Sequence, residues 1–392
     1  MIDVAVLGYG TIGSGVVEVL SRNRDIVAKH AGEEIRVSRV LDLREFPGSP
    51  IESILTHNVD DIMDDDAVDI VVEVMGGVHP AYDFVKRALE NGKSVVTSNK
   101  ALVAAYGPEL LQTAADHRVN FLFEASVGGG IPIIRPLIRC ITADEIEEIS
   151  GILNGTTNFI LTKMYREGSA FDATLKEAQA LGYAEADPTA DIEGFDPCRK
   201  IAILTSLAYG QFVDFEEIPC TGITRITEAD IAFAKALGRK IKLFGTSFLQ
   251  NGTVYAEVAP VMITSDHPLY AVDDVMNAIM VKGNMLGDVM FYGAGAGSLP
   301  TASAVVSDII VEAKHLDENI PIRMAPKKMT LGDISRTSSR YYVRLPKDAA
   351  VPFPVEQELT LEEYPEEKAY LTGLMTGAAV AEVQGAVFIK LR

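Results

Sequence analysis

The sequence predicts an α/β protein with a doubly wound parallel sheet, a second α+β domain and a short tail. Three observations predict this fold. Short apolar runs alternate with helical spacing over residues 1–135, and a glycine-rich turn joins the first run to the first helix. From about residue 145 the pattern changes to longer strands, such as 254–261, and to helices at 171–181 and 197–209.

The first apolar strand, at 2–7, leads into Gly8-Tyr-Gly-Thr-Ile-Gly13 and then into helical apolar spacing over 14–21. A dinucleotide site requires this order of strand, turn and helix. Gly8 permits the tight turn, Gly10 lets backbone N–H groups approach a pyrophosphate, and Gly13 lets the helix pack closely. The residues of this turn that we predict to bind the cofactor are Gly8, Gly10, Thr11, Ile12 and Gly13.

A second strand, at 35–41, ends at the acidic residue Asp42. The Asp42 carboxylate could bind the ribose hydroxyls of NAD, whereas Arg39 or Arg44 could accept the 2′-phosphate of NADP. The sequence leaves the choice between NAD and NADP open.

Strand candidates at 70–74 and 94–97, with a helix at 82–91 between them, continue the α/β alternation. A glycine-rich stretch at 293–301 precedes a helical run at 302–314, whose small residues suit close packing in the first domain. This stretch either lines the cofactor or acts as a hinge. The predicted domains are 1–135 (completed by about 296–320), 136–295, and a tail at 336–392.

The charge balance opposes two classes of partner. A net charge of -20 disfavours nonspecific binding to nucleic acid or to anionic membranes. No signal-peptide pattern and no apolar run of membrane-spanning length is present, so we expect a cytoplasmic protein. The three cysteines form no Cys-x-x-Cys pair, which predicts neither a disulfide framework nor a zinc site.

Residues 182–200 gather acidic side chains around Lys200. Asp196 followed by Pro197 is a strong signal for a helix N-cap and first helical residue, which would place Lys200 in the first turn. The helix macrodipole disfavours a cation there. The pattern therefore indicates an amine tuned for a reaction.

Four motifs together resemble the homoserine dehydrogenase family: the turn at 8–13, Ser-Asn-Lys-Ala-Leu at 98–102, the glycine-rich 124–132, and Gly-Ile-Leu-Asn-Gly-Thr-Thr-Asn at 151–158. The resemblance implies a Rossmann-type first domain and a second domain for substrate binding and dimerisation. It implies reversible reduction of L-aspartate 4-semialdehyde to L-homoserine by NADP or NAD, in threonine, methionine and isoleucine biosynthesis. A homodimer or homotetramer is implied as well.

The resemblance also implies residue roles. Lys200 matches the family's proton-transferring lysine, and Lys100 matches the lysine beside the nicotinamide and the reacting oxygen. The implied substrate-site residues are Glu185, Asp191, Asp196, Gly155, Thr156 and Tyr183. A sodium ion or another monovalent cation is implied near Glu124, held mainly by backbone carbonyls of Val127, Gly129 and Ile131.

These roles are chemically reasonable for the substrate. Its ammonium needs carboxylate partners, and oxidation of its alcohol needs a neutral amine to take the proton. A free lysine titrates near ~10.4. The helix N-terminus and Lys100 should lower the pKa of Lys200, whereas Asp196 should raise it, and the sequence leaves the balance open.

The tail resembles a regulatory ACT domain only in part. Residues 339–345 look like its first strand, but 346–354 replace the turn and helix that usually bind the effector. We therefore expect a shortened ACT-like tail with a packing or oligomerisation role and no feedback by threonine. Within it we expect strands at 340–345 and 385–391 and a helix at 370–376.

Two other functions compete with this interpretation. A semialdehyde dehydrogenase acting through a thioester would need a cysteine nucleophile, for which Cys198 is the candidate. A nonenzymatic nucleotide sensor would use the same fold, but it leaves the lysine and the acidic cluster unexplained.

Overall fold

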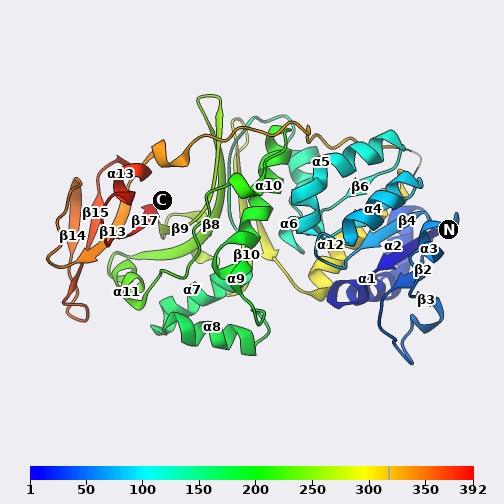
Figure 1. Cartoon of the computed structure of the whole chain (residues 1–392), viewed down its shortest axis with the longest axis horizontal. Helices are drawn as coiled ribbons and strands as arrows, with labels where there is room; N and C mark the ends of the chain where they lie inside the picture. Colours follow the sequence, from blue (N-terminus) through cyan, green and yellow to red (C-terminus); the bar gives the residue numbers. More distant parts are fainter. Residues whose placement is uncertain (317) are drawn as a thin grey trace. The chain divides into compact units, whose positions relative to one another are not determined.

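The computed structural model describes residues 1–316 and 318–392 (Figure 1). The chain divides into two compact units. The first unit comprises 1–145, 202–215 and 293–329, and the second comprises 146–201, 216–292 and 330–392. Each unit is built around its own sheet.

The sheet of the first unit has six strands in the order β3-β2-β1-β4-β5-β6, and its neighbouring strands run parallel. Its strands are β1 (Ile2–Leu7), β2 (Ile35–Leu41), β3 (Leu55–Thr56), β4 (Ile70–Glu73), β5 (Ser94–Thr97) and β6 (Phe121–Leu122). The buried, continuously apolar β1 and β4 are typical of parallel strands covered on both faces. The predicted parallel α/β sheet is confirmed.

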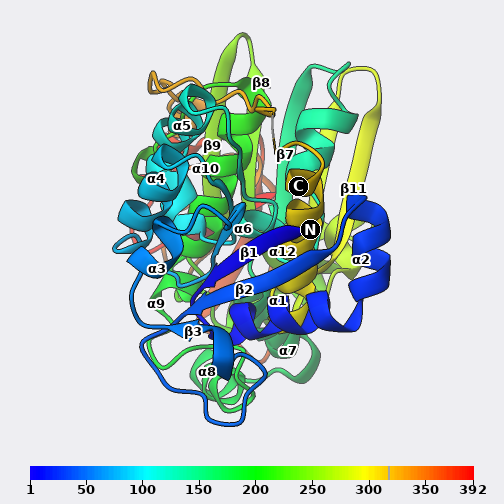
Figure 2. The ribbon, with the colours of Figure 1, turned by 90° about the vertical axis from the view of Figure 1, so that its right-hand side faces the viewer.

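Helices cover both faces of this sheet (Figure 2). The helices of the first unit are α1 (Thr11–Arg22), α2 (Arg24–Ala31), α3 (Asp60–Met63), α4 (Ala81–Glu90), α5 (Lys100–Asp116), α6 (Ala125–Gly128) and α12 (Ser298–Ala313). Helices α1, α2 and α12 enclose one apolar core with β1, β2 and β4. Gly15 of α1 lets α12 approach closely, because a Cβ there would lie 2.7 Å from the hydroxyl oxygen of Ser298.

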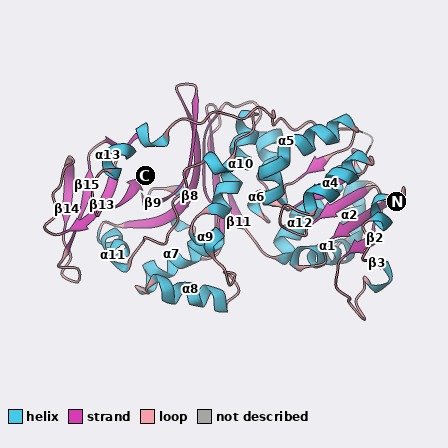
Figure 3. Cartoon of the chain, in the orientation of Figure 1, coloured by secondary structure: helices cyan, strands magenta, loops and turns pink. Residues whose placement is uncertain are grey.

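The second unit contains a mixed sheet of nine strands in the order β11-β10-β7-β8-β9-β17-β13-β15-β14 (Figure 3). Its strands are β7 (Ile146–Ile152), β8 (Arg239–Gln250), β9 (Thr253–Thr264), β10 (Met276–Gly283), β11 (Gly287–Ala294), β13 (Tyr341–Pro346), β14 (Val355–Leu359), β15 (Glu367–Thr372) and β17 (Val387–Leu391). The short strands β12 (Ser338–Ser339) and β16 (Met375–Thr376) pair separately. The tail strands thus extend the larger sheet through the parallel pair β17–β9.

The other helices of the chain are α7 (Gly155–Glu167), α8 (Phe171–Ala180), α9 (Thr189–Ile192), α10 (Phe195–Tyr209), α11 (Glu228–Ala236) and α13 (Gly377–Ala381). None of the helices in the described part of the chain combines the length and the apolar character needed to cross a membrane.

A buried ion pair joins the tail to α11. The Arg344 guanidinium of β13 donates to both carboxylate oxygens of Asp230, at 2.7 and 3.0 Å, and the Tyr342 hydroxyl donates to the same group at 3.1 Å. Asp230 is fully buried, and Arg344 also pairs with Glu367. The ACT-like interpretation of the tail stays a prediction.

Two local predictions were wrong. Residues 370–376 were expected to be helical, but Tyr370 lies in strand β15, between β13 and β14, where its buried ring packs against Phe353 at 5.8 Å. Cross-strand pairing therefore overrides the local helical preference. The helix at Lys200 begins earlier than expected, at Phe195, so Asp196 is not its N-cap and Lys200 lies in the second turn.

Candidate active site

The glycine turn between β1 and α1 leaves room for a phosphate. Gly8 has a φ of 96°, which favours glycine. A Cβ on Gly13 would lie 1.9 Å from the Gly8 carbonyl oxygen, so only glycine lets the helix start this close to the turn. A Cβ on Gly10 would meet no protein atom within 4 Å. The open side of Gly10, at the N-terminus of the twelve-residue helix α1, fits a pyrophosphate.

Asp42 follows β2 and is held beside this turn. Its carboxylate accepts hydrogen bonds from the backbone N–H of Tyr9 at 2.8 Å and from the Arg44 guanidinium at 2.9 Å. The hydrogen bonds from Arg44 hold the pKa of Asp42 well below its usual range. Arg39 instead donates to the Ser38 carbonyl and lies 3.6 Å from Asp65. Of the two candidate arginines, Arg44 is the one that contacts Asp42.

Lys200 is buried in the second unit, with two identified acceptors. Its amine donates to the Leu153 carbonyl at 2.7 Å and to the Asp196 carboxylate at 2.8 Å. Leu153 directly follows β7, so the end of this strand and the first turns of α10 together position the amine. Lys200 is 7% exposed and Asp196 is 2% exposed, which makes this a desolvated ion pair.

Asn154 connects the two acidic residues of the site. Its amide nitrogen donates to Asp191 at 2.8 Å and to Asp196 at 2.9 Å. Its amide oxygen accepts from the Thr157 backbone and caps α7. Burial, and then the charge of Asp196, raises the pKa of Asp191. The sequence analysis assigned Asn154 no role, although it lies within the motif at 151–158 and directly before helix α7.

The other predicted substrate residues differ in placement. The Thr156 hydroxyl donates to the Tyr183 carbonyl at 2.6 Å and also hydrogen-bonds Asp191. Gly155 begins α7, where a Cβ would lie 2.8 Å from the Val275 carbonyl oxygen. Tyr183 is partly exposed, and Glu185 lies on an exposed segment. The structure therefore brings Thr156, Asp191, Asp196 and Lys200 together around Asn154 and leaves the Glu185 side chain at the surface.

Lys100 is the first residue of α5 in the first unit. Asn99 caps this helix by accepting from the Leu102 backbone at 3.1 Å, and it donates to the Gly77 carbonyl at 2.5 Å. The cap fixes the backbone from which the Lys100 side chain extends. A cation at the N-terminus of a helix is disfavoured by the macrodipole, so its placement there is consistent with a functional role.

Comparisons with known proteins identify the family. Residues 8–124 match the model of the homoserine dehydrogenase NAD-binding domain, and residues 132–310 match the model of homoserine dehydrogenase. The chain belongs to the homoserine dehydrogenase family. It is therefore an NAD(P)-dependent oxidoreductase with homoserine dehydrogenase activity.

Relatives in this family are similar over most of their lengths. The homoserine dehydrogenase of Bacillus subtilis is 45% identical over 318 residues, which cover 80% of this chain and 73% of that protein. The crystal structure of a homoserine dehydrogenase from Thiobacillus denitrificans matches with a TM-score of 0.91 and 37% identity, covering 100% of this chain and 98% of that one. A hyperthermophilic archaeal homoserine dehydrogenase in complex with NADPH matches at 0.70 and 30%, covering 82% and 99%.

Glu124 is buried, and its carboxylate binds backbone N–H groups of the segment that follows it. Its carboxylate accepts from the N–H groups of Ile133, Ile134 and Arg135 at 2.6 to 2.8 Å, and from the Arg135 guanidinium at 3.1 Å. Among the described residues, no group of three or more His, Cys, Asp or Glu side chains could hold a metal ion. The monovalent cation near Glu124, with Val127, Gly129 and Ile131 as its backbone ligands, stays a prediction.

Two further acidic residues of this family member are buried on α12, and sequence reasoning missed both. Asp308 accepts from the Glu124 backbone N–H at 2.8 Å, and burial raises its pKa to about 7. Burial also raises the pKa of Glu312 to about 8. Contacts with the Asn120 and Ser94 side chains partly offset this rise in the pKa, although neither Glu312 carboxyl oxygen has a well-aligned hydrogen-bond partner among the described residues. The apolar residues around them in the sequence did not indicate that these two carboxyl groups would be buried.

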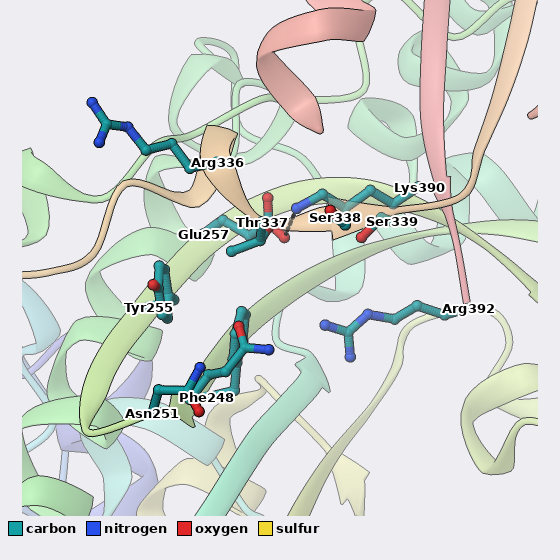
Figure 4. Close-up of a pocket in the computed structure, with 11 residues that line it drawn as sticks. Phe248, Asn251, Tyr255, Glu257, Arg336, Thr337, Ser338, Ser339, Lys390 and Arg392 are labelled. Atoms are coloured by element: carbon teal, nitrogen blue, oxygen red, sulfur yellow. Dashed lines mark hydrogen bonds and ion pairs between the residues drawn. The ribbon is translucent and has the colours of Figure 1, made fainter. Parts of the chain in front are cut away.

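A polar cavity of about 370 Å³ lies in the second unit between β8, β9 and the tail (Figure 4). An ion pair between Lys390 and Glu257 spans it, and Phe248 stacks on Tyr255 with ring centroids 5.1 Å apart. Figure 4 shows the Arg392 side chain directed into the space between the ion pair and the two aromatic rings. None of the residues predicted to bind substrate or cofactor lines this cavity.

Proposed function

We propose that Lys200 carries the proton in the interconversion of L-homoserine and L-aspartate 4-semialdehyde, and that Asp191 and Asp196 bind the substrate ammonium. The observation that supports this most directly is the Lys200 amine fixed between the Leu153 carbonyl and the Asp196 carboxylate. Asn154 holds the second carboxylate, Asp191, beside the first. Two adjacent carboxylates carry more negative charge than one lysine balances. A second cation therefore fits beside them, and the substrate ammonium is such a cation.

Within this proposal each residue has one task. When bound, a nicotinamide cofactor would accept or supply the hydride. Lys200 accepts the hydroxyl proton as a neutral amine during oxidation and donates it to the aldehyde oxygen as an ammonium during reduction. We propose Lys100 as a second catalytic lysine, whose charge stabilises an oxygen that becomes negative in the transition state. We further propose that the substrate pocket around Lys200 is shaped by Gly155, Thr156, Tyr183 and Glu185.

We expect kcat for homoserine oxidation to rise with pH, because the proton-accepting form of Lys200 is the neutral amine and lower pH removes that form. For aldehyde reduction the ammonium is required, so kcat should fall as pH rises. The measurement is the absorbance of the reduced cofactor in each direction across about pH 6 to 10. A flat profile in the oxidation direction would exclude Lys200 as the base.

We propose that Arg44 binds the 2′-phosphate of NADP, and that the Asp42 carboxylate accepts hydrogen bonds from the ribose hydroxyls of NAD. Arg44 supports this because its guanidinium is more than half exposed and is aligned by Asp42 and by the Tyr9 carbonyl at 3.1 Å. A guanidinium–phosphate contact contributes about 1.5–3 kcal/mol. The fit of the glycine turn to a pyrophosphate is common to both cofactors.

Arg44→Ala is expected to lower kcat/KM for NADPH by about tenfold or more and to change that for NADH little. Arg39→Ala is the matched control, because Arg39 is the other candidate arginine at this end of β2 but pairs with Asp65. Steady-state kinetics with each cofactor make the comparison. An equal loss with NADH and NADPH would show that Arg44 does not read the phosphate.

We propose that the backbone carbonyls of Val127, Gly129 and Ile131 bind sodium or another monovalent cation. Glu124 supports the site indirectly, because its carboxylate orders the following backbone. Replacing sodium with a bulky organic cation at constant ionic strength is expected to lower kcat and Tm together. Unchanged kcat and Tm would contradict the cation site.

The remaining proposals concern location and assembly. We propose a cytoplasmic enzyme that forms a homodimer or homotetramer through its second unit, with the tail as a shortened ACT-like element. The thioester alternative is disfavoured, because Cys198 is 3% exposed and its thiol pKa is raised by its hydrogen bond to Cys220 and by burial.

A further inference from the structure

Two cysteines that are separate in the sequence meet in the second unit. The thiols of Cys198 and Cys220 hydrogen-bond each other. Cys198 lies in the first turn of α10 and is buried, with its sulfur 4.0 Å from the Ile218 carbonyl oxygen. Cys220 is partly exposed, and its thiol donates to the Glu193 carbonyl at 3.2 Å. Both cysteines are free thiols in the structure.

The backbone holds Cys220 in place from both sides. On one side it forms a bridge to Val258 of β9, where Thr221 N–H donates to the Val258 carbonyl at 2.7 Å. On the other side the Ile223 N–H donates to the Ile192 carbonyl at 2.8 Å, just before α10. The backbone that carries the Cys220 thiol is thus held on both sides by hydrogen bonds to other segments of the second unit.

The two thiols differ in reactivity. The hydrogen bond from Cys198 lowers the pKa of Cys220, whereas the same bond and burial raise the pKa of Cys198. Because the thiolate is the reactive form, the more exposed Cys220 is the one that meets an oxidant. Cys198 is then the adjacent thiol that can complete a disulfide.

We propose that Cys198 and Cys220 form a reversible disulfide on exposure to a hydroperoxide, and that this disulfide slows turnover. The Cys220 thiolate attacks one peroxide oxygen, the O–O bond breaks, and Cys220 becomes a sulfenic acid while the other oxygen leaves as water after taking a proton. The Cys198 sulfur then attacks the Cys220 sulfur, the S–O bond breaks, and the Cys198 proton leaves with that oxygen as a second water. Two thiols and one hydrogen peroxide give one disulfide and two waters.

The disulfide would act on the substrate site through helix α10. Cys198 lies two positions after Asp196 and two before Lys200 on the same helix. A disulfide brings the sulfurs to about 2.05 Å, so the first turn of α10 must shift from its hydrogen-bonded position. Because small displacements of a proton carrier are costly, we expect kcat to fall by about tenfold, while the Gly8 turn in the first unit keeps its cofactor affinity.

The test uses the purified protein treated with hydrogen peroxide, followed by alkylation of free thiols and peptide mass spectrometry. The expected result is a linked Cys198–Cys220 peptide, lighter by two hydrogen atoms, with a parallel loss of kcat that dithiothreitol reverses. NADPH affinity, measured by fluorescence, should not change. Absence of the linked peptide, or its presence with unchanged kcat, would overturn the proposal.

Matched variants separate this disulfide from other oxidation. Cys220→Ser is expected to keep its kcat before and after peroxide. Cys140→Ser should lose activity as the unaltered protein does, since Cys140 is an exposed cysteine of the first unit and is not one of the two proposed partners. Peroxide inactivation of Cys220→Ser to the same extent would also overturn the proposal. The linked peptide is measured on the unaltered protein, so a folding defect in a variant does not affect that result. Detection of the linked peptide is also independent of whether Lys200 carries the proton. The expected loss of kcat rests on that proposed function.

Discussion

Lys200→Ala is expected to lower kcat by about a thousandfold or more in both directions, because general acid–base catalysis contributes about 10²–10⁴ to the rate. The loss should appear in kcat and in kcat/KM alike, since the proton is in flight only in the transition state. The alanine variant also leaves Asp196 without a partner that lies 2.8 Å away. Turnover of homoserine with NADP+ and of the aldehyde with NADPH measures the effect.

The control for this prediction separates chemistry from folding and binding. NADPH affinity should be unchanged, because the glycine turn belongs to the first unit and Lys200 to the second. Lys282→Ala removes an exposed lysine of the same unit, paired with Glu147, and should leave kcat near its original value. Near-normal turnover in a folded Lys200→Ala protein would refute the proposed role.

Arg344→Ala is expected to lower the free energy of unfolding by about 3–5 kcal/mol, the usual cost of removing one partner from a buried ion pair. The variant leaves the Asp230 carboxylate fully buried without the guanidinium that reaches it at 2.7 Å. It also removes the contact to Glu367. Urea unfolding followed by circular dichroism gives the free energy, with an unchanged m-value as the sign of an intact native fold.

Arg340→Ala provides the surface comparison on the adjoining segment. Arg340 pairs with Glu356 at 3.1 Å, and both side chains are about half exposed, so water screens the pair. We expect that substitution to change stability by less than about 1 kcal/mol. Equal effects of the two substitutions would mean that the Arg344–Asp230 contact adds nothing beyond a surface pair.

The first unit was predictable because its signals are local. Strand 2–7, the glycine turn and the following helix are neighbours in sequence. β1 has the predicted bounds, and α1 contains the predicted 14–21 but begins earlier, at Thr11. The strands at 35–41 and 94–97 were also located to the residue. Parallel strands buried on both faces appear in the sequence as continuous apolar runs. They can therefore be located without knowing which strands they pair with.

The errors and omissions arose where partners come from distant segments. Tyr370 lies in a strand because β13 and β14 flank it, and a short window of sequence contains neither. Asp196 resembles a cap when read beside Pro197, yet its carboxylate faces Asn154 and Lys200. Asn154 and the Cys198–Cys220 contact depend on segments that are adjacent only in the fold.

The parallel pair β17–β9 closes what would otherwise be an open strand edge. Lys390 and Leu391 pair with Val261 and Met262, so the backbone groups at this end of β9 have partners from the tail. Loss of the tail would leave this end of β9 with unpaired N–H and C=O groups, a template for pairing with other molecules. A short segment at the end of the sequence thus protects the protein against self-association, whatever other role the tail has.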